Sequence, residues 1–158
     1  MRDRTSLIKY HKEMGYKVGA EIGVYRGRNA GRLYRWGGVE KLYCIDSWAG
    51  KYACHEEPAR IHLAQYPGIE ILKGNSLDIA KTFKDGSLDF VYIDANHTYE
   101  SVKEDLRAWF PKVREGGLME GHDYQMEEVK RAIDEFVGKD YKFNVTWGII
   151  PSNWFFTK

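Results

Sequence analysis

Two residues that can bind ions and move protons follow a strongly apolar stretch of the chain. Asp94 comes directly after residues 88–93, which are apolar or aromatic except for Asp89, and His97 follows three positions later. Such a run, bounded by polar residues, predicts a strand buried on both faces of a parallel sheet. Ligands of these sheets bind just beyond the carboxyl ends of the strands, so Asp94 and His97 are the first candidates for chemistry. The alternative is that Asp94 only forms a turn or caps the next helix.

A second candidate site lies earlier, where glycines and acids follow two short apolar segments. In Glu21-Ile-Gly23-Val-Tyr-Arg-Gly27 the glycines permit a tight turn and a close approach of the backbone to a ligand. Asp46 ends the next apolar segment, where an acid can accept both hydroxyls of a ribose. The spacing is not the G-x-G-x-x-G of dinucleotide sites, because Gly19, Gly23 and Gly27 are four residues apart. No Lys-Ser/Thr pair follows Gly27, so a phosphate-binding P-loop is excluded as well.

Short apolar segments alternate with amphipathic ones, which predicts an α/β domain with a mostly parallel sheet. One helix, residues 5–14, is expected before the first strand. The last two strands are separated only by Pro151-Ser-Asn153, and a join that short permits only an antiparallel hairpin. We expect seven strands, at residues 18–24, 42–45, 69–72, 88–93, from 118 onward, 143–150 and 154–157. The helices between them are expected at residues 28–36, 59–66, 76–83, 99–113 and 126–137.

Composition places the chain among ordinary globular proteins. Its 158 residues are 43% hydrophobic, which is enough for a single domain over residues 1–158 with a real core. The 24 Lys and Arg nearly balance the 23 Asp and Glu, so the basic excess of a protein that binds nucleic acid or a membrane surface is missing. No apolar stretch approaches the length of a membrane span, and residues 1–6 do not resemble a signal peptide. We expect a cytoplasmic protein without a disulfide between Cys44 and Cys54.

The motifs together resemble a class I S-adenosylmethionine-dependent methyltransferase. The resemblance rests on Glu-x-Gly-x-x-x-Gly at residues 21–27, on Asp46 and on the terminal hairpin. Ile93-Asp-Ala-Asn-His-Thr-Tyr99 and Gly116-Gly-Leu-Met-Glu-Gly-His-Asp-Tyr124 narrow it to the branch of macrocin-type sugar O-methyltransferases, more distantly related to catechol O-methyltransferase. The resemblance covers about residues 15–158. It implies a Rossmann-like methyltransferase fold, a mostly parallel seven-stranded sheet with a C-terminal antiparallel hairpin.

The resemblance implies S-adenosylmethionine as the cofactor and a position for each part of it. Asp46 would hold the ribose, and Asp94 would border the cofactor. Trp48 would either form a wall of the same pocket or only pack nearby. The remaining positions are Glu21, Gly23 and Gly27, under the methionine part, and Asn75 and Ser76, beside the adenine.

The resemblance also assigns Asp94 and Asp123 to a magnesium ion and His97 to the general base. Elementary chemistry supports this independently, since magnesium prefers hard oxygen ligands and the two acids end neighbouring strands. Such an ion can stabilise the alkoxide charge that develops on an acceptor hydroxyl, and a histidine can take the proton near neutral pH. His122 would support the ligands or contact the substrate. The alternative is an Asp pair that only caps two helices.

The chain departs from the family in its short N-terminal part. Typical members carry extra N-terminal helices or a lid over the acceptor, and here one helix precedes the first strand. A third carboxylate ligand for the metal cannot be placed from the sequence. The acceptor, a small molecule or a glycan, is therefore expected in an open site, in a site completed by a second copy of a homo-oligomer, or in a site suited to a large glycan.

Three functions fit these observations. The first is methyl transfer from S-adenosylmethionine to an oxygen, expected to be a sugar hydroxyl, in which alignment of the reactants supplies much of the rate. The second is an NAD-dependent oxidoreductase, against which the missing dinucleotide motif and the final hairpin count. The third is a non-catalytic cofactor-binding or assembly subunit on the same fold, which the short N-terminal part permits.

Overall fold

A single seven-stranded sheet forms the centre of the computed structural model, which describes residues 4–139, 141–146 and 153–158. The strands are β1 Val18–Ile22, β2 Lys41–Asp46, β3 Ile69–Lys73, β4 Leu88–Ile93, β5 Val113–Gly121, β6 Phe143–Thr146 and β7 Asn153–Thr157. Their order is β3-β2-β1-β4-β5-β7-β6. The first five strands are parallel, and β7 is antiparallel to both β5 and β6. This confirms the predicted Rossmann-like α/β fold with an antiparallel C-terminal part.

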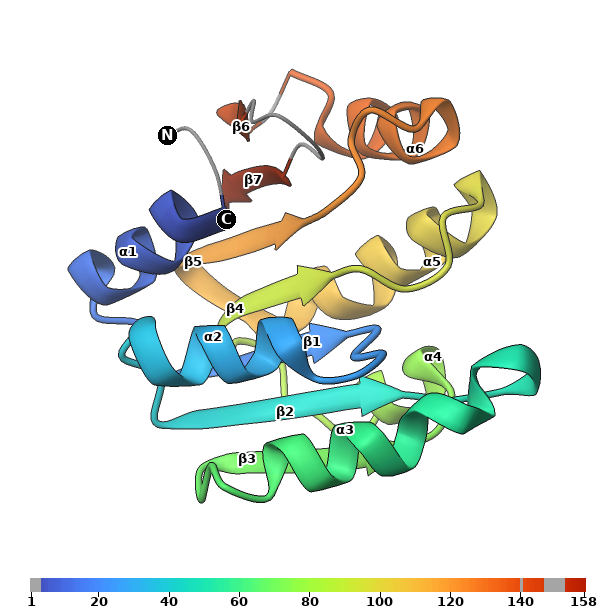
Figure 1. The fold of residues 1–158 in the computed structure, drawn as a ribbon. Coiled ribbons are helices and arrows are strands. Elements are labelled where there is room, and N and C mark those ends of the chain that lie inside the picture. The colour runs from blue at the N-terminus through green and yellow to red at the C-terminus, as the bar shows by residue number, and fades with distance from the viewer. Residues whose placement is uncertain (1–3, 140, 147–152) are drawn as a thin grey trace.

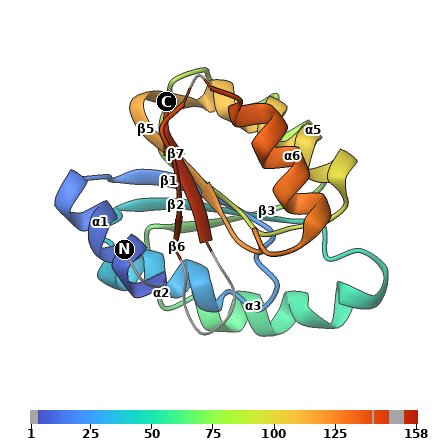
Figure 2. The same cartoon turned by 90° about the horizontal axis from the view of Figure 1, so that it is seen from above.

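Helices cover both faces of the sheet (Figures 1 and 2). One face carries α1, α2 and α3, and the other carries α4, α5 and α6. Each layer buries its own apolar cluster against the strands, so the core is divided in two by the sheet. The helices are α1 Arg4–Met14, α2 Arg28–Trp36, α3 Glu56–Leu63, α4 Ser76–Ala80, α5 Tyr99–Trp109 and α6 Glu127–Val137.

The apolar run of β4 lies in the interior of the sheet, between β1 and β5. Phe90 and Tyr92 belong to the cluster under α1 and α2, and Val91 and Ile93 belong to the cluster under α5 and α6. All four side chains are buried, as expected for a strand that is apolar on both faces. This placement brings Asp94, the next residue, to the carboxyl edge of the sheet.

A buried contact between a histidine and a carboxyl group connects α1 to β5. His11 Nε2 lies 2.9 Å from Glu120 Oε1, and neither side chain is exposed. The His11 ring also packs against Phe90, with 4.3 Å between the ring centroids. Burial raises the pKa of Glu120, and the neighbouring imidazole of His11 opposes that rise. The pair therefore fixes the N-terminal helix to the strand that leads to Asp123.

Several predicted boundaries differ from the structure. The strand expected at residues 18–24 ends at Ile22, and the helices expected to end at residues 66 and 83 end at Leu63 and Ala80. Three further differences have a physical explanation, and prolines account for two of them. The helix expected to reach residue 113 ends at Trp109, because Pro111 cannot continue it, and Phe110–Lys112 form one turn of 3₁₀ helix. The helix expected from residue 59 begins at Glu56, since Pro58 in a first turn loses no hydrogen bond.

The third boundary concerns the fifth strand, which begins at Val113 and not at residue 118. Val113 pairs with Leu88 and Leu118 pairs with Phe90, so residues 114–117 form an irregular bulge within the strand. The sixth predicted strand is observed as Phe143–Thr146, and residues 147–150 lie outside the described part of the chain.

Two further findings concern the cysteines and the helices. Cys44 is buried, Cys54 is exposed, and both are free thiols. In the ranges that the structure describes, no helix combines the length and the apolar character needed to cross a membrane.

Candidate active site

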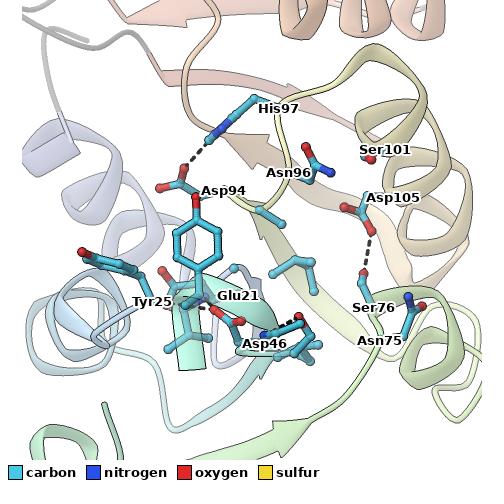
Figure 3. A pocket seen from close by; sticks show the side chains of 18 of the residues that line it. Glu21, Tyr25, Asp46, Asn75, Ser76, Asp94, Asn96, His97, Ser101 and Asp105 are labelled. Atoms are coloured by element: carbon cyan, nitrogen blue, oxygen red, sulfur yellow. Dashed lines mark hydrogen bonds and ion pairs between the residues drawn. The ribbon is translucent and has the colours of Figure 1, made fainter. Parts of the chain in front are cut away.

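A cleft of about 1000 Å³ opens at the carboxyl edge of the parallel strands. The arrowheads of β1, β2, β4 and β5 point to the same side in Figure 1, and the loops after them form its walls. The volume is at the upper end of the ~300–1,000 Å³ of typical ligand cavities. Of the predicted site residues, all but Gly27 line this cleft, namely Glu21, Gly23, Asp46, Asn75, Ser76, Asp94, His97 and Asp123. Figure 3 labels Glu21, Asp46, Asn75, Ser76, Asp94 and His97.

The loop after β1 depends on glycine at two positions. Gly23 has a φ of +89°, and a Cβ there would lie 2.2 Å from the carbonyl oxygen of Asp94. Gly27 has a φ of +77°, and its Cβ would lie 2.8 Å from Leu63 Cγ. Any side chain would therefore be strained and also crowded at both positions. Gly23 brings the loop after β1 against the end of β4, and Gly27 packs against Leu63 of α3 and does not line the cleft.

The Asp46 carboxylate organises the loops on both sides of it. Asp46 Oδ2 accepts hydrogen bonds from the backbone N–H groups of Val24 and Tyr25, each at 2.9 Å. Its Oδ1 accepts a bond from the backbone N–H of Trp48 at 2.8 Å. A carboxylate offers about four acceptor positions, so capacity for a ribose hydroxyl remains. Trp48 itself is buried, donates from Nε1 to the carbonyl of Tyr25 and does not line the cleft, which fits the packing role.

Asn75 and Ser76 lie after β3, at the opposite end of the cleft from His97 (Figure 3). The Asn75 side chain caps α4 by accepting from the backbone N–H of Leu77 at 2.9 Å. Ser76 Oγ donates to Asp105 Oδ1 at 2.5 Å and accepts from Trp109 Nε1 at 2.8 Å. Burial raises the pKa of Asp105 from 3.8 to about 6, against the opposing effect of the Ser76 hydroxyl. Both predicted adenine neighbours thus have structural roles that do not exclude contact with a ligand.

Asp94, His97 and Asp123 come together at the mouth of β4 and β5. Their ligand atoms all lie within 4.8 Å of one another, a spacing that can hold a metal ion. His97 Nε2 is 3.0 Å from Asp123 Oδ2 and 3.5 Å from Asp94 Oδ1. His122 Nδ1 approaches the same two oxygens, at 3.2 Å and 3.7 Å respectively. The predicted pair of acids is therefore accompanied by two imidazoles.

The charges within this cluster shift the pKa values of His97 and Asp123 in opposite directions. Asp123, and after it Asp94, raises the pKa of His97 to about 9 by hydrogen bonding and by its negative charge. The pKa of Asp123 is held well below its usual range, first by His122 and then by His97. With no further cation beside the two carboxylates, His97 is protonated at neutral pH and cannot accept a second proton. A neutral imidazole at pH 7, which the sequence made plausible, requires another cation beside the acids.

Asp123 is held in a strained backbone conformation. Its φ of +60° lies in the left-handed region that L-residues rarely adopt. Gln125 Nε2 donates to Asp123 Oδ1 at 2.8 Å, which leaves Oδ2 directed at the two histidines. Strain of this kind persists only where the surroundings enforce it, and it gathers at functional sites.

Sequence reasoning missed several residues of the cleft. One of them was detectable: Asp105 lies at helical spacing between Val102 and Trp109, so an acid interrupts the buried stripe of α5. The others carry no local signal, because the fold brings their loops to the cleft from separate parts of the chain. Among them are Arg28, Asn29, Lys51, Tyr52, Ser101 and Glu104.

Comparison with known proteins gives one family and many structures. Residues 20–124 match the family described as "Methyltransferase domain". An O-methyltransferase from Bacillus cereus in complex with SAH superposes with a TM-score of 0.77 at 16% identity, covering 98% of this chain and 80% of that one. The O-methyltransferase NovP superposes with a TM-score of 0.77 at 22% identity, covering 98% of this chain and 79% of that one. Cofactor-bound Rv0187 from MTB superposes with a TM-score of 0.78 at 17% identity, covering 98% of this chain and 78% of that one. No curated protein matches in sequence.

Proposed function

This chain belongs to the methyltransferase domain family, and on that premise we propose that it transfers the methyl group of S-adenosylmethionine to a hydroxyl oxygen of a sugar, a glycan or a related small molecule. One observation carries the proposal. A single cleft joins the glycine loop and Asp46 to the cluster of Asp94, His97 and Asp123. A donor seated on the first group would present its methyl group toward an acceptor seated on the second.

The cofactor side of the proposal is supported by the loop geometry. Gly23 lines the cleft and lets its loop pack against the backbone of Asp94, and Asp46 has acceptor capacity left for a ribose hydroxyl. Asn75 and Ser76 stand at the far end, where the adenine would lie. The structural neighbours include one protein in complex with SAH, the product left when S-adenosylmethionine loses its methyl group.

The acceptor side is supported by a donor set that suits a divalent cation. Asp94 and Asp123 would hold the ion, for which the sequence predicts magnesium. Among the described residues, the buried Nε2 atom of His122 has no hydrogen-bond partner, as expected of a cluster that leaves room for a further group. When bound, the ion would polarise the acceptor hydroxyl and stabilise its alkoxide. It would also compensate the carboxylate charge that now keeps a proton on His97.

His97 is the proposed proton acceptor. Its side chain is one-third exposed, so it can meet a hydroxyl that enters from the mouth of the cleft. The ring lies at the start of α5, on a loop ordered by Thr98, whose backbone N–H donates to Asn96 Oδ1 at 3.2 Å. Its Nε2 is directed at both carboxylates, so a hydroxyl held beside Asp94 and Asp123 would be within its reach.

The sugar character of the acceptor is supported by aromatic rings at the edge of the cleft. Tyr25 and Tyr52 both line it and remain about half exposed, with 6.4 Å between their ring centroids. An exposed tyrosine offers an apolar face and a polar tip, a combination that suits the faces and hydroxyls of a sugar ring.

The test is a methyl-transfer assay with isotopically labelled S-adenosylmethionine and a panel of free sugars, glycosides and glycans, read by mass spectrometry. We expect label on an acceptor oxygen, loss of transfer after treatment with a chelator, and recovery on adding a divalent cation. Binding of the cofactor without transfer to any member of the panel would favour the assembly-subunit alternative. Tight binding of NAD without binding of SAH would favour the oxidoreductase alternative.

A further inference from the structure

Two histidines approach the same pair of carboxylate oxygens, and both belong to the cluster that the proposed function uses. His97 Nε2 lies 3.0 Å from Asp123 Oδ2 and 3.5 Å from Asp94 Oδ1. His122 Nδ1 lies 3.2 Å from Asp123 Oδ2 and 3.7 Å from Asp94 Oδ1. A cation with metal–ligand bonds of 2.0–2.2 Å places neighbouring ligand atoms about 3.0–3.5 Å apart. The nitrogens thus already stand near the distances at which they would share one ion with the acids.

The two histidines differ in how firmly they are held. The side chain of His122 is 8% exposed, whereas that of His97 is 33% exposed. His122 is fixed at the end of β5, where its backbone N–H donates to the carbonyl of Ile93 and its own carbonyl accepts from Trp154 Nε1 at 3.0 Å. His97 lies on the loop after β4 and faces the mouth of the cleft. A fixed, desolvated nitrogen suits a permanent ligand, and a more exposed one suits proton exchange with an acceptor.

The neighbouring acid supports the same assignment. Asp123 directly follows His122, and its positive φ turns Oδ2 toward His122 Nδ1 while Gln125 binds Oδ1. The backbone conformation of Asp123 thus directs His122 Nδ1 and Asp123 Oδ2, which belong to adjacent residues, toward the same position in the cleft. Asp94 Oδ1, at the end of the neighbouring strand β4, approaches the same position.

We infer that His122 Nδ1 is the third protein ligand of the cation, so that the site is made of two carboxylate oxygens and one imidazole nitrogen. This inference rests on the proposed function only for the place of the ion. It supplies the ligand for which the sequence offered no third carboxylate. It also changes the expected metal, because imidazole suits ions of the first transition series, whereas magnesium prefers oxygen throughout. The native ion is therefore a divalent transition metal, and magnesium is a weaker substitute.

The experiment measures metal binding by the full chain without cofactor or acceptor, so its result does not depend on methyl transfer. Metal-free protein is titrated with Co²⁺ and with Mg²⁺ by calorimetry, and the Mn²⁺ complex is examined by electron spin echo envelope modulation, which detects a nitrogen bound to the metal. The variant is His122→Asn, whose side-chain oxygen replaces Nδ1 at similar reach. The matched control is His62→Asn, on α3 and outside the cleft.

We expect a nitrogen signal from the wild type and from His62→Asn, and none from His122→Asn. The ratio of Co²⁺ affinity to Mg²⁺ affinity should fall at least tenfold in His122→Asn and stay unchanged in the control. A wild-type Mn²⁺ complex without a nitrogen signal would overturn the inference, and so would a signal that persists in His122→Asn. If His122→Asn does not fold, His97→Gln decides the assignment, because the signal must survive that change and its loss would make His97 the ligand.

Discussion

The backbone of Gly23 lies against the backbone of Asp94, since a Cβ at Gly23 would be 2.2 Å from the Asp94 carbonyl oxygen and 2.6 Å from Ala95 Cα. This contact joins the loop that would carry the methyl donor to the strand end that would carry the acceptor's metal. The separation of the two reacting groups is thus fixed by main chain, which cannot adjust by changing a rotamer. Proximity of this kind can supply a large part of a rate enhancement.

The first prediction is that Gly23→Ala both destabilises the fold and abolishes SAH binding. A left-handed φ alone costs an alanine about 1–2 kcal/mol, and here the clash with Asp94 adds to that cost. Gly15→Ala is the matched control, because Gly15 has a φ of +69° and nothing within 4 Å of its Cβ. Urea unfolding should show Gly23→Ala losing at least about twice as much free energy of unfolding as Gly15→Ala. Equal losses would mean that the contact between the two main chains does not matter.

The second prediction concerns Asp46. Asp46→Ala should weaken SAH binding by about 1–3 kcal/mol, the scale for losing hydrogen bonds to a charged group. The loss has two sources, the ribose contact and the three backbone N–H groups of the adjoining loops. Calorimetry with SAH measures it, and Asp78→Ala, an exposed acid paired with Lys81, is the control. Unchanged affinity in Asp46→Ala would remove the residue from the cofactor site.

The third prediction is that His97→Gln lowers kcat by about 10²- to 10⁴-fold, the usual contribution of a positioned base. Glutamine keeps a polar side chain of similar reach but cannot take a proton. SAH affinity should remain within a factor of about two, since the His97 ring contacts Asp94 and Asp123 and not the loop that contains Gly23. His62→Gln provides the control in single-turnover and steady-state measurements. A near-normal kcat in His97→Gln would show that the proton leaves by another route.

The fourth prediction is a pH-dependent stability difference at Asp105. Burial raises its pKa from 3.8 to about 6 in the folded protein, so the folded state binds this proton more tightly than the unfolded state does. The resulting stabilisation is complete below about pH 4 and is lost as the pH rises to about 6. Asp105→Asn removes the titration, so its stability relative to the wild type should rise by up to about 3 kcal/mol between pH 4 and pH 7. Urea unfolding of both proteins across that range measures the difference, and a pH dependence that is the same in Asp105→Asn and in the wild type would contradict the prediction.

The fold and eight of the residues that line the cleft could be predicted because their signals are local. The apolar run of β4 indicates a buried parallel strand, and the ends of α2 at Arg28 and Trp36 were predicted at the observed residues. Asp94 and Asp123 follow strands that prove to be neighbours, so topology alone brings them together. The glycine loop was detectable because positive φ values and close backbone contacts leave few other residues permitted there.

The rest depends on contacts between distant parts of the chain. His11 shows no sign in the sequence of its partner Glu120, more than a hundred residues away, and their burial follows only from the packing of α1 on β5. The three backbone N–H groups that donate hydrogen bonds to the Asp46 carboxylate are likewise positioned by the conformations of two loops. His122 could be named as a neighbour of the metal site, but its role as a ligand depends on the orientation of its ring, which no pattern of residue types encodes.

The insertion of β7 between β5 and β6 has a consequence for biosynthesis. In the described part of the chain β6 pairs only with β7, so residues 143–146 emerge from the ribosome before the strand that joins them to the sheet. During that interval the outer edge of β5 also lacks its partner. An unpaired edge that follows an otherwise complete parallel sheet is a template for the edges of other nascent chains. Residues 153–157 therefore close this side of the sheet, since they supply the pairing partner of both β5 and β6.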